Sequence, residues 1–164
     1  MTRVLFLDVD GVLNSERTRI AFGGYPGDFS AVDMGKFDHA AINMVRALCR
    51  KADLSVVVSS AWRIAFGWDE IGKALDLPTI GQTPRLPGAR GHEIAAWLAE
   101  HPEVESYAIL DDSGDMLPEQ MERFAQTSMY DGLRWDDMQR LCAMFGLTAY
   151  DCFNKEPALG WERN

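Results

Sequence analysis

The apolar residues of the chain alternate between short β-rich runs and longer stretches with helical spacing. Residues 4–9 form a nearly continuous apolar run, as expected of a strand buried on both faces, and residues 54–58 form a second, β-branched run. Between them, apolar residues recur at helical spacing over 37–52. Similar patterns predict a helix at 68–77, a weak strand at 79–81, a helix around 94–98, a strand at 107–110, a short helix at 118–124, a strand at 125–130 and a helix at 135–145. This alternation predicts an α/β fold, with an open, mostly parallel sheet and helices on both faces.

One segment interrupts this alternation directly after the first strand. Residues 14–36 are mixed polar residues that include five glycines or prolines. We expect a loop or flap here, and loops that follow the strands of α/β sheets lie at their functional edge. No linker or internal repeat divides the remaining sequence, so residues 1–164 are predicted to form one domain.

The composition excludes several classes of protein. With 47% hydrophobic and 25% charged residues, the 164-residue chain has the composition of a globular protein rather than a disordered one. It has no apolar run of the roughly 20 residues that span a bilayer and no secretory signal pattern, so we expect no membrane association. The net charge of −9 disfavours nucleic-acid binding by bulk electrostatics, although it leaves a local basic patch open. Three widely spaced cysteines form neither a zinc motif nor a disulfide framework, which predicts a cytoplasmic location.

Two acidic segments stand where parallel strands are expected to end. Asp8 and Asp10 follow the first strand, and Asp111 and Asp112 follow the strand at 107–110. Open α/β sheets bind ligands outside the carboxyl ends of their strands, so both segments should face one crevice. Carboxylates that converge there repel one another unless a divalent cation holds them, and oxygen ligands favour Mg²⁺ over zinc. An ordinary acidic turn explains either segment alone, but two at equivalent strand ends favour a site.

The spacing of Asp8 and Asp10 allows a division of labour between them. On an extended strand their side chains would share a face, whereas a turn at Gly11 lets Asp10 swing over the site. Asp8 is then the candidate nucleophile, and Asp10 is the candidate group that protonates a leaving oxygen and later activates water. A metal that bridges Asp8 and the substrate would screen the repulsion between two anions.

The sequence DVDGVLN at residues 8–14 resembles the first motif of the haloacid dehalogenase (HAD) superfamily, whose phosphatases carry Asp-x-Asp followed by Gly. The second motif of that superfamily is a Ser or Thr that ends an apolar strand. It selects Ser59, with Ser60 as the alternative, as the phosphate-binding hydroxyl. Either serine is also a reasonable cap for the helix that follows, and the two roles are compatible because helix N-termini bind anions.

The remaining two motifs of the superfamily match with one departure. The third is usually a lysine at the phosphate, and here Arg90 is better placed than any lysine, with Arg85 as the alternative. A guanidinium binds phosphate as a fork rather than as a point charge. The fourth motif, a strand followed by Asp-Asp, matches residues 109–112, and Asp115 is a further candidate. The resemblance thus implies catalytic Asp8 and Asp10, a Mg²⁺ set of Asp8, Asp10 (through its backbone carbonyl), Asp111 and Asp112, and a phosphate-binding set of Gly11, Ser59, Ser60 and Arg90.

Further elements resemble, more specifically, the HAD-type domain of Swiss Army knife RNA repair proteins. They include the residues at 59–63, 93–98 and 132–133, and the resemblance extends over about residues 3–146. It implies a Rossmann-like fold and a phosphomonoesterase that acts on nucleic-acid ends, carrying a 3′- or 5′-phosphate, or on nucleotides. Kinship of fold does not by itself fix a substrate.

Neither position at which HAD proteins insert a cap domain has room for one here. A flap of roughly 20 residues precedes the first long helix, and about 30 residues separate Ser59 from Arg90. Such an open site would admit a nucleic-acid end, a phosphoprotein or a small nucleotide. Candidates to line the opening, by stacking on a base or holding phosphates, are Arg17, Arg19, Tyr25, Trp62, Arg63 and Trp68. Both tryptophans are read more simply as core residues.

The residues leave three alternatives to this interpretation. A phosphatase of proteins or small metabolites would need the same catalytic residues. A dehalogenase is disfavoured by Asp10, because cleavage of a carbon–halogen bond requires no proton on the leaving group. A non-catalytic binding module with the same fold is disfavoured because Asp8, Asp10 and Asp111 are all present.

Overall fold

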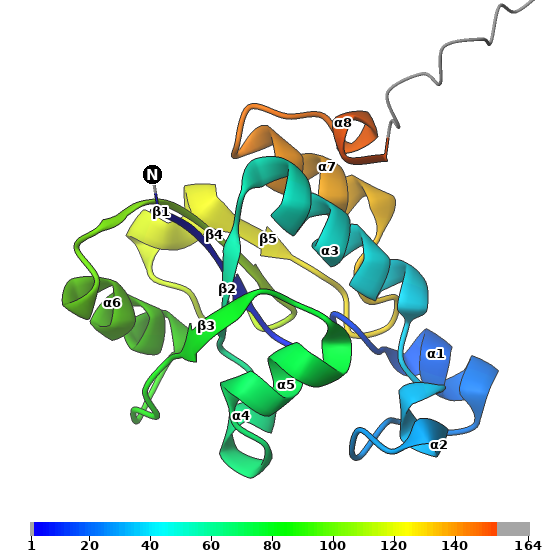
Figure 1. Ribbon diagram of the computed structural model, residues 1–164. Coiled ribbons are helices and arrows are strands. Elements are labelled where there is room, and N and C mark those ends of the chain that lie inside the picture. The colour runs from blue at the N-terminus through cyan, green and yellow to red at the C-terminus, as the bar shows by residue number, and fades with distance from the viewer. Residues whose placement is uncertain (1, 154–164) are drawn as a thin grey trace, which may run out of the picture.

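A five-stranded sheet forms the centre of the molecule (Figure 1). The computed structural model describes residues 2–153. All paired strands run parallel, and their spatial order is β3 (Thr79–Gln82), β2 (Ser55–Val58), β1 (Thr2–Leu7), β4 (Val104–Asp111) and β5 (Phe124–Gln126). The predicted open parallel sheet is therefore confirmed.

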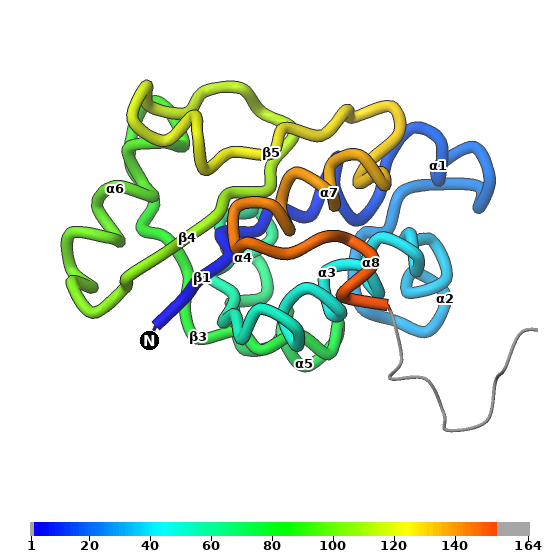
Figure 2. The backbone as a smooth tube through the Cα atoms, turned by 90° about the horizontal axis from the view of Figure 1, so that it is seen from above, coloured from blue at the N-terminus to red at the C-terminus, as the bar shows by residue number. Residues whose placement is uncertain are grey.

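Helices cover both faces of this sheet, as the sequence predicts (Figures 1 and 2). On one face α3 (His39–Ala52), α5 (Trp68–Leu75) and α7 (Trp135–Ala143) contribute apolar side chains to the larger core cluster. On the other face α6 (Arg90–Glu100) packs against the sheet through Ile94 and Trp97. The fold thus has three layers, with helices on each side of a buried sheet.

The alternation of side chains along β1 explains why this strand is apolar throughout. Leu5 and Leu7 belong to the core under α3 and α7, whereas Val4 and Phe6 belong to the core under α6. All four are almost completely buried. Successive side chains of a strand point to opposite faces, so a central parallel strand needs apolar residues at every position.

Strand register brings the ends of the three central strands to the same level. The N–H of Asp8, just after β1, donates to the carbonyl of Leu110 in β4 at 3.0 Å. The N–H of Ser59, just after β2, donates to the carbonyl of Leu7 at 3.0 Å. Strands β2 and β3 lie on one side of β1 within the sheet, and β4 and β5 lie on its other side. The strand order therefore reverses at β1, and α/β sheets bind ligands at such a point.

The segment after β1 is helical where the sequence predicted a loop. Residues 14–36 contain α1 (Glu16–Phe22) and α2 (Ala31–Met34). Ser15 caps α1 in a reciprocal pair with Thr18, and Ser30 caps α2, so each short helix has its own start signal. The glycines do not prevent these helices; Gly23 ends α1 in a left-handed conformation, with φ at +76°.

Backbone hydrogen bonds attach the start of this segment to the loop that follows β5. The N–H groups of Glu16 and Arg17 donate to the carbonyls of Met129 and Tyr130, both at 3.0 Å. An isolated bridge between Ser128 and Gly132 closes that loop. The predicted strand over 125–130 is correspondingly shorter, since β5 ends at Gln126 and the following residues turn toward α1.

Three short helices complete the described chain: α4 (Trp62–Ala65), the 3₁₀ helix η1 (Pro118–Arg123) and α8 (Ala149–Phe153). Of these, α4 is the helix expected after Ser59 and Ser60, whereas α8 was not among the predicted elements. Within residues 2–153, no helix combines the length and the apolar character that crossing a membrane requires.

Candidate active site

Three carboxylates converge at the carboxyl edge of the sheet and form what we call the acidic cluster: Asp8, Asp111 and Asp112. One carboxylate oxygen of each lies within 4.8 Å of the others. Asp8 is 5% exposed and Asp111 is fully buried, whereas Asp112 is half-buried. Because β1 and β4 are neighbours in register, the two acidic segments that lie about 100 residues apart in the sequence meet here, as predicted.

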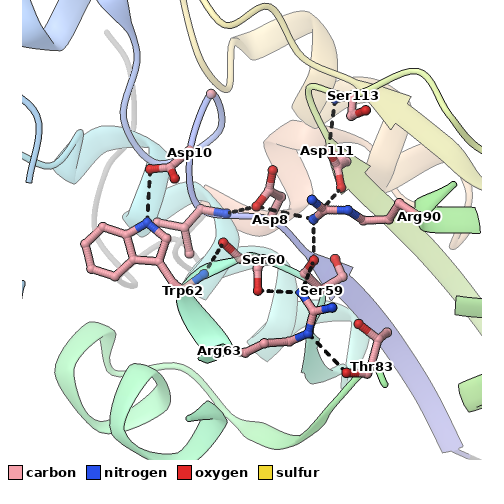
Figure 3. Close-up of polar contacts among 12 residues, drawn as sticks. Asp8, Asp10, Ser59, Ser60, Trp62, Arg63, Thr83, Arg90, Asp111 and Ser113 are labelled. Carbon is pink, nitrogen blue, oxygen red and sulfur yellow. Dashed lines mark hydrogen bonds and ion pairs between the residues drawn. The ribbon is translucent and has the colours of Figure 1, made fainter. Parts of the chain in front are cut away.

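Arg90 faces this cluster from the start of α6 (Figure 3). Its Nη1 atom lies 3.1 Å from Oδ2 of Asp111 and 3.5 Å from Oδ1 of Asp8, and it also donates to the carbonyl of Ser59. Arg85 is exposed and has no hydrogen bond or ion pair within residues 2–153. Of the two arginines that the sequence offered for this position, the structure therefore brings Arg90 to the cluster.

Asp115 holds the helix that carries Arg90 rather than joining the cluster. Its carboxylate accepts the backbone N–H of Arg90 at 3.0 Å, and its carbonyl accepts the N–H of Gly91 at 3.1 Å. A carboxylate at a helix N-terminus satisfies free N–H groups and complements the helix dipole. The sequence offered Asp115 as a further metal ligand, but its contacts in the structure are those of a cap.

Burial dominates the electrostatics of the cluster. Burial raises the pKa of Asp8, although Arg90 and a hydrogen bond from Ser60 oppose this effect. Burial and the neighbouring Asp8 raise the pKa of Asp111 to about 8. Burial and Asp8 also raise the pKa of Asp112. Burial would lower the pKa of Arg90, but the carboxylates of Asp8 and Asp111 outweigh it and raise that pKa.

The acidic cluster fits a divalent cation. Its donors are all carboxylate oxygens, the kind of ligand that Mg²⁺ prefers. Oδ2 of Asp111 is buried and accepts no hydrogen bond of good geometry from the described part of the chain, although Nη1 of Arg90 lies within ion-pair distance. One guanidinium thus faces three carboxylates, and a bound cation would compensate the remaining negative charge.

The carboxylate of Asp10 is not part of this cluster and lies on the opposite side of Asp8 from Asp111 (Figure 3). Its Oδ1 accepts hydrogen bonds from Nδ2 of Asn14 at 2.9 Å and from Nε1 of Trp62 at 3.0 Å. Asp10 is exposed, whereas Asp8 is buried. The turn at Gly11 therefore separates two carboxylates that an extended strand would have kept on one face.

The two serines after β2 occupy different environments. The hydroxyl of Ser60 accepts the backbone N–H of Trp62 at 3.3 Å and lies close enough to the Asp8 carboxylate to lower its pKa. The hydroxyl of Ser59 is buried and has no hydrogen-bond partner within residues 2–153, while its carbonyl accepts from Arg90. The sequence favoured Ser59 for the phosphate-binding hydroxyl; the structure brings the alternative, Ser60, to Asp8.

Gly11 allows the backbone to pass directly beside Asp112. Its φ is +73°, and a Cβ atom at this position would lie 2.2 Å from Oδ2 of Asp112. The hydroxyl of Thr127 donates to its carbonyl at 2.7 Å, which fixes the turn to the residues after β5. Both the backbone conformation and the close approach require glycine here.

Arg63 is buried and lines a small cavity of about 230 Å³ at the start of α6, where its contacts are mainly structural. Its buried guanidinium pairs with Glu93 at 2.9 Å and donates to the carbonyls of Ser59, Ser60 and Thr83. Burial lowers the pKa of Arg63, and Glu93 opposes that shift. These contacts connect the turn after β2 to the loop after β3 and to α6, so Arg63 is a structural residue.

A cleft of about 480 Å³ opens beside Asp10, and we call it the Asp10 cleft. Tyr25 and Trp62 line it, as predicted for residues at the opening, and the structure adds Met129, which the sequence gave no reason to choose. Its full lining is Asp10, Gly11, Asn14, Ser15, Tyr25, Pro26, Gly27, Trp62, Asp112 and Met129. The segment after β1 therefore forms one wall of this cleft.

The other candidates for the opening lie elsewhere. Arg17 lines a separate surface depression, Arg19 pairs with Glu16 at 2.9 Å, and Trp68 lines a depression beside β3. Trp62 is 8% exposed, in agreement with its reading as core, but Trp68 is 37% exposed and that reading is wrong for it.

A parallel sheet that gathers buried carboxylates, an arginine and serines at the ends of its three central strands defines a HAD-type domain. Comparison with protein families agrees: the model of the HAD domain in Swiss Army Knife RNA repair proteins matches residues 4–138. The chain belongs to this family. No curated protein and no solved structure gives a significant match. Membership of the family supports a HAD-type phosphatase.

Replacing Gly11 with alanine is expected to destabilise the protein more than the same change at Gly23. Both glycines have φ near +75°, but a Cβ at Gly23 would have no atom of the described residues within 4 Å, so Gly23→Ala carries only the conformational cost of about 1 kcal/mol. Gly11→Ala adds the clash with Asp112. Urea unfolding of both variants measures the difference, and equal losses would contradict the close approach described here.

Replacing Arg63 with methionine is expected to cost about 3 kcal/mol of unfolding free energy, because it leaves Glu93 buried without its partner. Arg19→Met is the matched control: its ion pair with Glu16 has the same 2.9 Å distance but is exposed, so its loss should cost much less than the loss of the buried pair. Chemical denaturation compares them. Similar small losses would show that Arg63 has no structural role.

Proposed function

We propose that this protein is a Mg²⁺-dependent phosphomonoesterase that acts through a phosphoaspartyl intermediate. The observation that carries the proposal is the placement of two carboxylates from one turn: Asp8 is buried beside Arg90 and Asp111, and Asp10 is exposed at a cleft. The first environment suits a nucleophile and the second suits a proton donor.

In the first step, a carboxylate oxygen of Asp8 attacks phosphorus and forms an acyl phosphate. The bond between phosphorus and the leaving oxygen breaks, and the carboxyl group of Asp10 gives its proton to that oxygen, so an alcohol is released. Arg90 and the Ser60 hydroxyl, both in contact with Asp8, are in reach of the phosphoryl oxygens and hold them.

In the second step, Asp10, now a carboxylate, takes a proton from a water molecule. The water oxygen attacks phosphorus, the acyl-phosphate bond breaks, and inorganic phosphate leaves while Asp8 regains its carboxylate. Asp10 thus acts as a general acid and then as a general base, which requires it to remain close to solvent.

Asp8, Asp111 and Asp112, with the backbone carbonyl of Asp10, would hold Mg²⁺. When bound, the cation supplies positive charge that reduces repulsion between the attacking carboxylate and the phosphate and stabilises the charge of the transition state. Within the described residues, the acidic cluster has Arg90 as its one ion-pair partner, so this charge complements what the protein provides.

The Asp10 cleft supports a nucleotide or the terminal nucleotide of a nucleic acid as substrate. It lies on the side of Asp10, where the leaving group must be, and its wall includes the aromatic rings of Tyr25 and Trp62. Tyr25 is 43% exposed and can stack on a base irrespective of its identity, whereas Trp62 is 8% exposed and belongs to the wall behind it. The described lining of the cleft contains no Lys or Arg. Such a surface suits the uncharged base and sugar of one nucleoside better than the additional phosphate groups of a longer strand. The RNA repair proteins in the family's description agree with this substrate class.

Phosphate release should depend on Asp8 and on Mg²⁺. We expect the wild type to hydrolyse at least one of three substrates: a 3′-phosphorylated oligonucleotide, a 5′-phosphorylated one, or nucleoside monophosphates. Asp8→Asn should lose activity by about 10³-fold or more, because it removes the nucleophile, and EDTA should abolish turnover until Mg²⁺ is restored. Equal activity of wild type and Asp8→Asn would refute the mechanism. Activity on phosphoproteins or small metabolites, with none on the three substrates above, would refute the substrate class.

Arg90→Ala should lower kcat/KM by about 100-fold, the usual effect of removing one charged donor to a transition state. Arg85→Ala is the matched control, since Arg85 lies five residues earlier, is exposed and makes no ion pair among residues 2–153. It should leave kcat/KM within about 2-fold of wild type. Steady-state phosphate release separates them, and a larger loss in Arg85→Ala would reverse the assignment.

A further inference from the structure

Two N–H groups from different parts of the chain converge on a single oxygen of Asp10. Nδ2 of Asn14 and Nε1 of Trp62 both donate to Oδ1, at 2.9 and 3.0 Å, and Figure 3 shows the bond from Trp62. Asn14 belongs to the same turn as Asp10, whereas Trp62 opens α4, 52 residues further along the chain. The indole is thus the donor that ties Asp10 to the end of β2.

Trp62 is itself held firmly in place. It is 8% exposed, and its ring lies 5.2 Å from Phe29, 5.6 Å from Phe37 and 5.4 Å from Phe66, measured between ring centroids. Its backbone N–H donates to the hydroxyl of Ser60 at 3.3 Å. An exposed carboxylate such as Asp10 would otherwise sample several rotamers, so a donor fixed in this way restricts its orientation.

We propose that Trp62 is a positioning residue that aims the carboxyl group of Asp10 at the leaving oxygen of the substrate. Both donors occupy Oδ1, so Oδ2 is the oxygen left to deliver a proton into the Asp10 cleft. In the step concerned, the leaving oxygen takes this proton as its bond to phosphorus breaks, and Asp10 remains as a carboxylate. The proposal rests on the general-acid role of Asp10 in the proposed function.

A positioning role predicts a specific dependence on the leaving group. Phenyl, 4-nitrophenyl and 2,4-dinitrophenyl phosphate have leaving groups of similar shape whose need for a proton falls in that order. Trp62→Phe keeps an aromatic ring among the phenylalanines but removes the N–H. We expect kcat/KM to fall by about 10-fold or more for phenyl phosphate and by less than about 2-fold for 2,4-dinitrophenyl phosphate. The larger loss is a part of the roughly 10²–10⁴-fold acceleration that a general acid contributes.

Phe66→Leu is the control for a merely structural effect. Phe66 stacks on Trp62 but gives Asp10 no hydrogen bond, so its loss perturbs the aromatic group and leaves the donor in place. It should lower kcat/KM by the same factor for all three esters. Because kcat/KM reports the steps up to release of the first product, the later general-base role of Asp10 does not enter the comparison.

The possible results separate the two proposals. A steep dependence on the leaving group in Trp62→Phe, absent from Phe66→Leu, supports the positioning role. An active wild type with a uniform loss in Trp62→Phe overturns the positioning role and leaves the phosphatase intact. A wild type that matches Asp8→Asn on all three esters overturns the phosphatase, and the role of Trp62 with it.

Discussion

The concentration of negative charge at the end of β1 is the constraint on which the rest of the site depends. Burying Asp8 and Asp111 side by side is unfavourable, because each loses hydration and repels the other. Arg90 offsets part of this cost, and it reaches both carboxylates only because Asp115 fixes the start of α6. The carbonyl of Ser59 holds the same guanidinium from below, and the Ser59 backbone is fixed in turn by Arg63. The need to compensate the buried negative charge of Asp8 and Asp111 thus accounts for contacts from β2, β4 and α6.

Parallel topology explains how these groups reach one place. The three central strands end in register, so the residue after each one arrives at the same edge without further folding of a loop. Asp10 follows a different rule, since the left-handed turn at Gly11 carries it away from the sheet to the edge of the Asp10 cleft. The site therefore has a rigid, buried half made by the strand ends and an accessible half made by the turn. That division matches the requirements of a nucleophile and of a group that exchanges protons with solvent.

Much of the fold and of the site could be predicted from the local hydrophobic pattern and from the expected order of the strands. The apolar runs predicted the parallel sheet, and the acids that follow them predicted that Asp8 and Asp111 would meet. What the sequence did not reveal depends on distant partners: Glu93, 30 residues from Arg63, makes that arginine structural, and the N–H of Arg90 makes Asp115 a cap. The choice between Ser59 and Ser60 depends on how the backbone turns after β2. For α1 a local signal was present, because Ser15 and Thr18 have the spacing of a capping pair, but the density of glycines outweighed it.

The attachment of α1 to the loop after β5 has a consequence for how such a domain can diversify. Met129 lines the Asp10 cleft and its carbonyl also receives the N–H of Glu16, so one short peripheral loop sets the spacing between two walls. Length changes in that loop would widen or narrow the cleft while the strand ends, Arg90 and the acidic cluster stay unchanged. Changes confined to residues 129–131 would therefore reshape the cleft while Thr127 keeps its hydrogen bond to the carbonyl of Gly11, which fixes the turn beside Asp10.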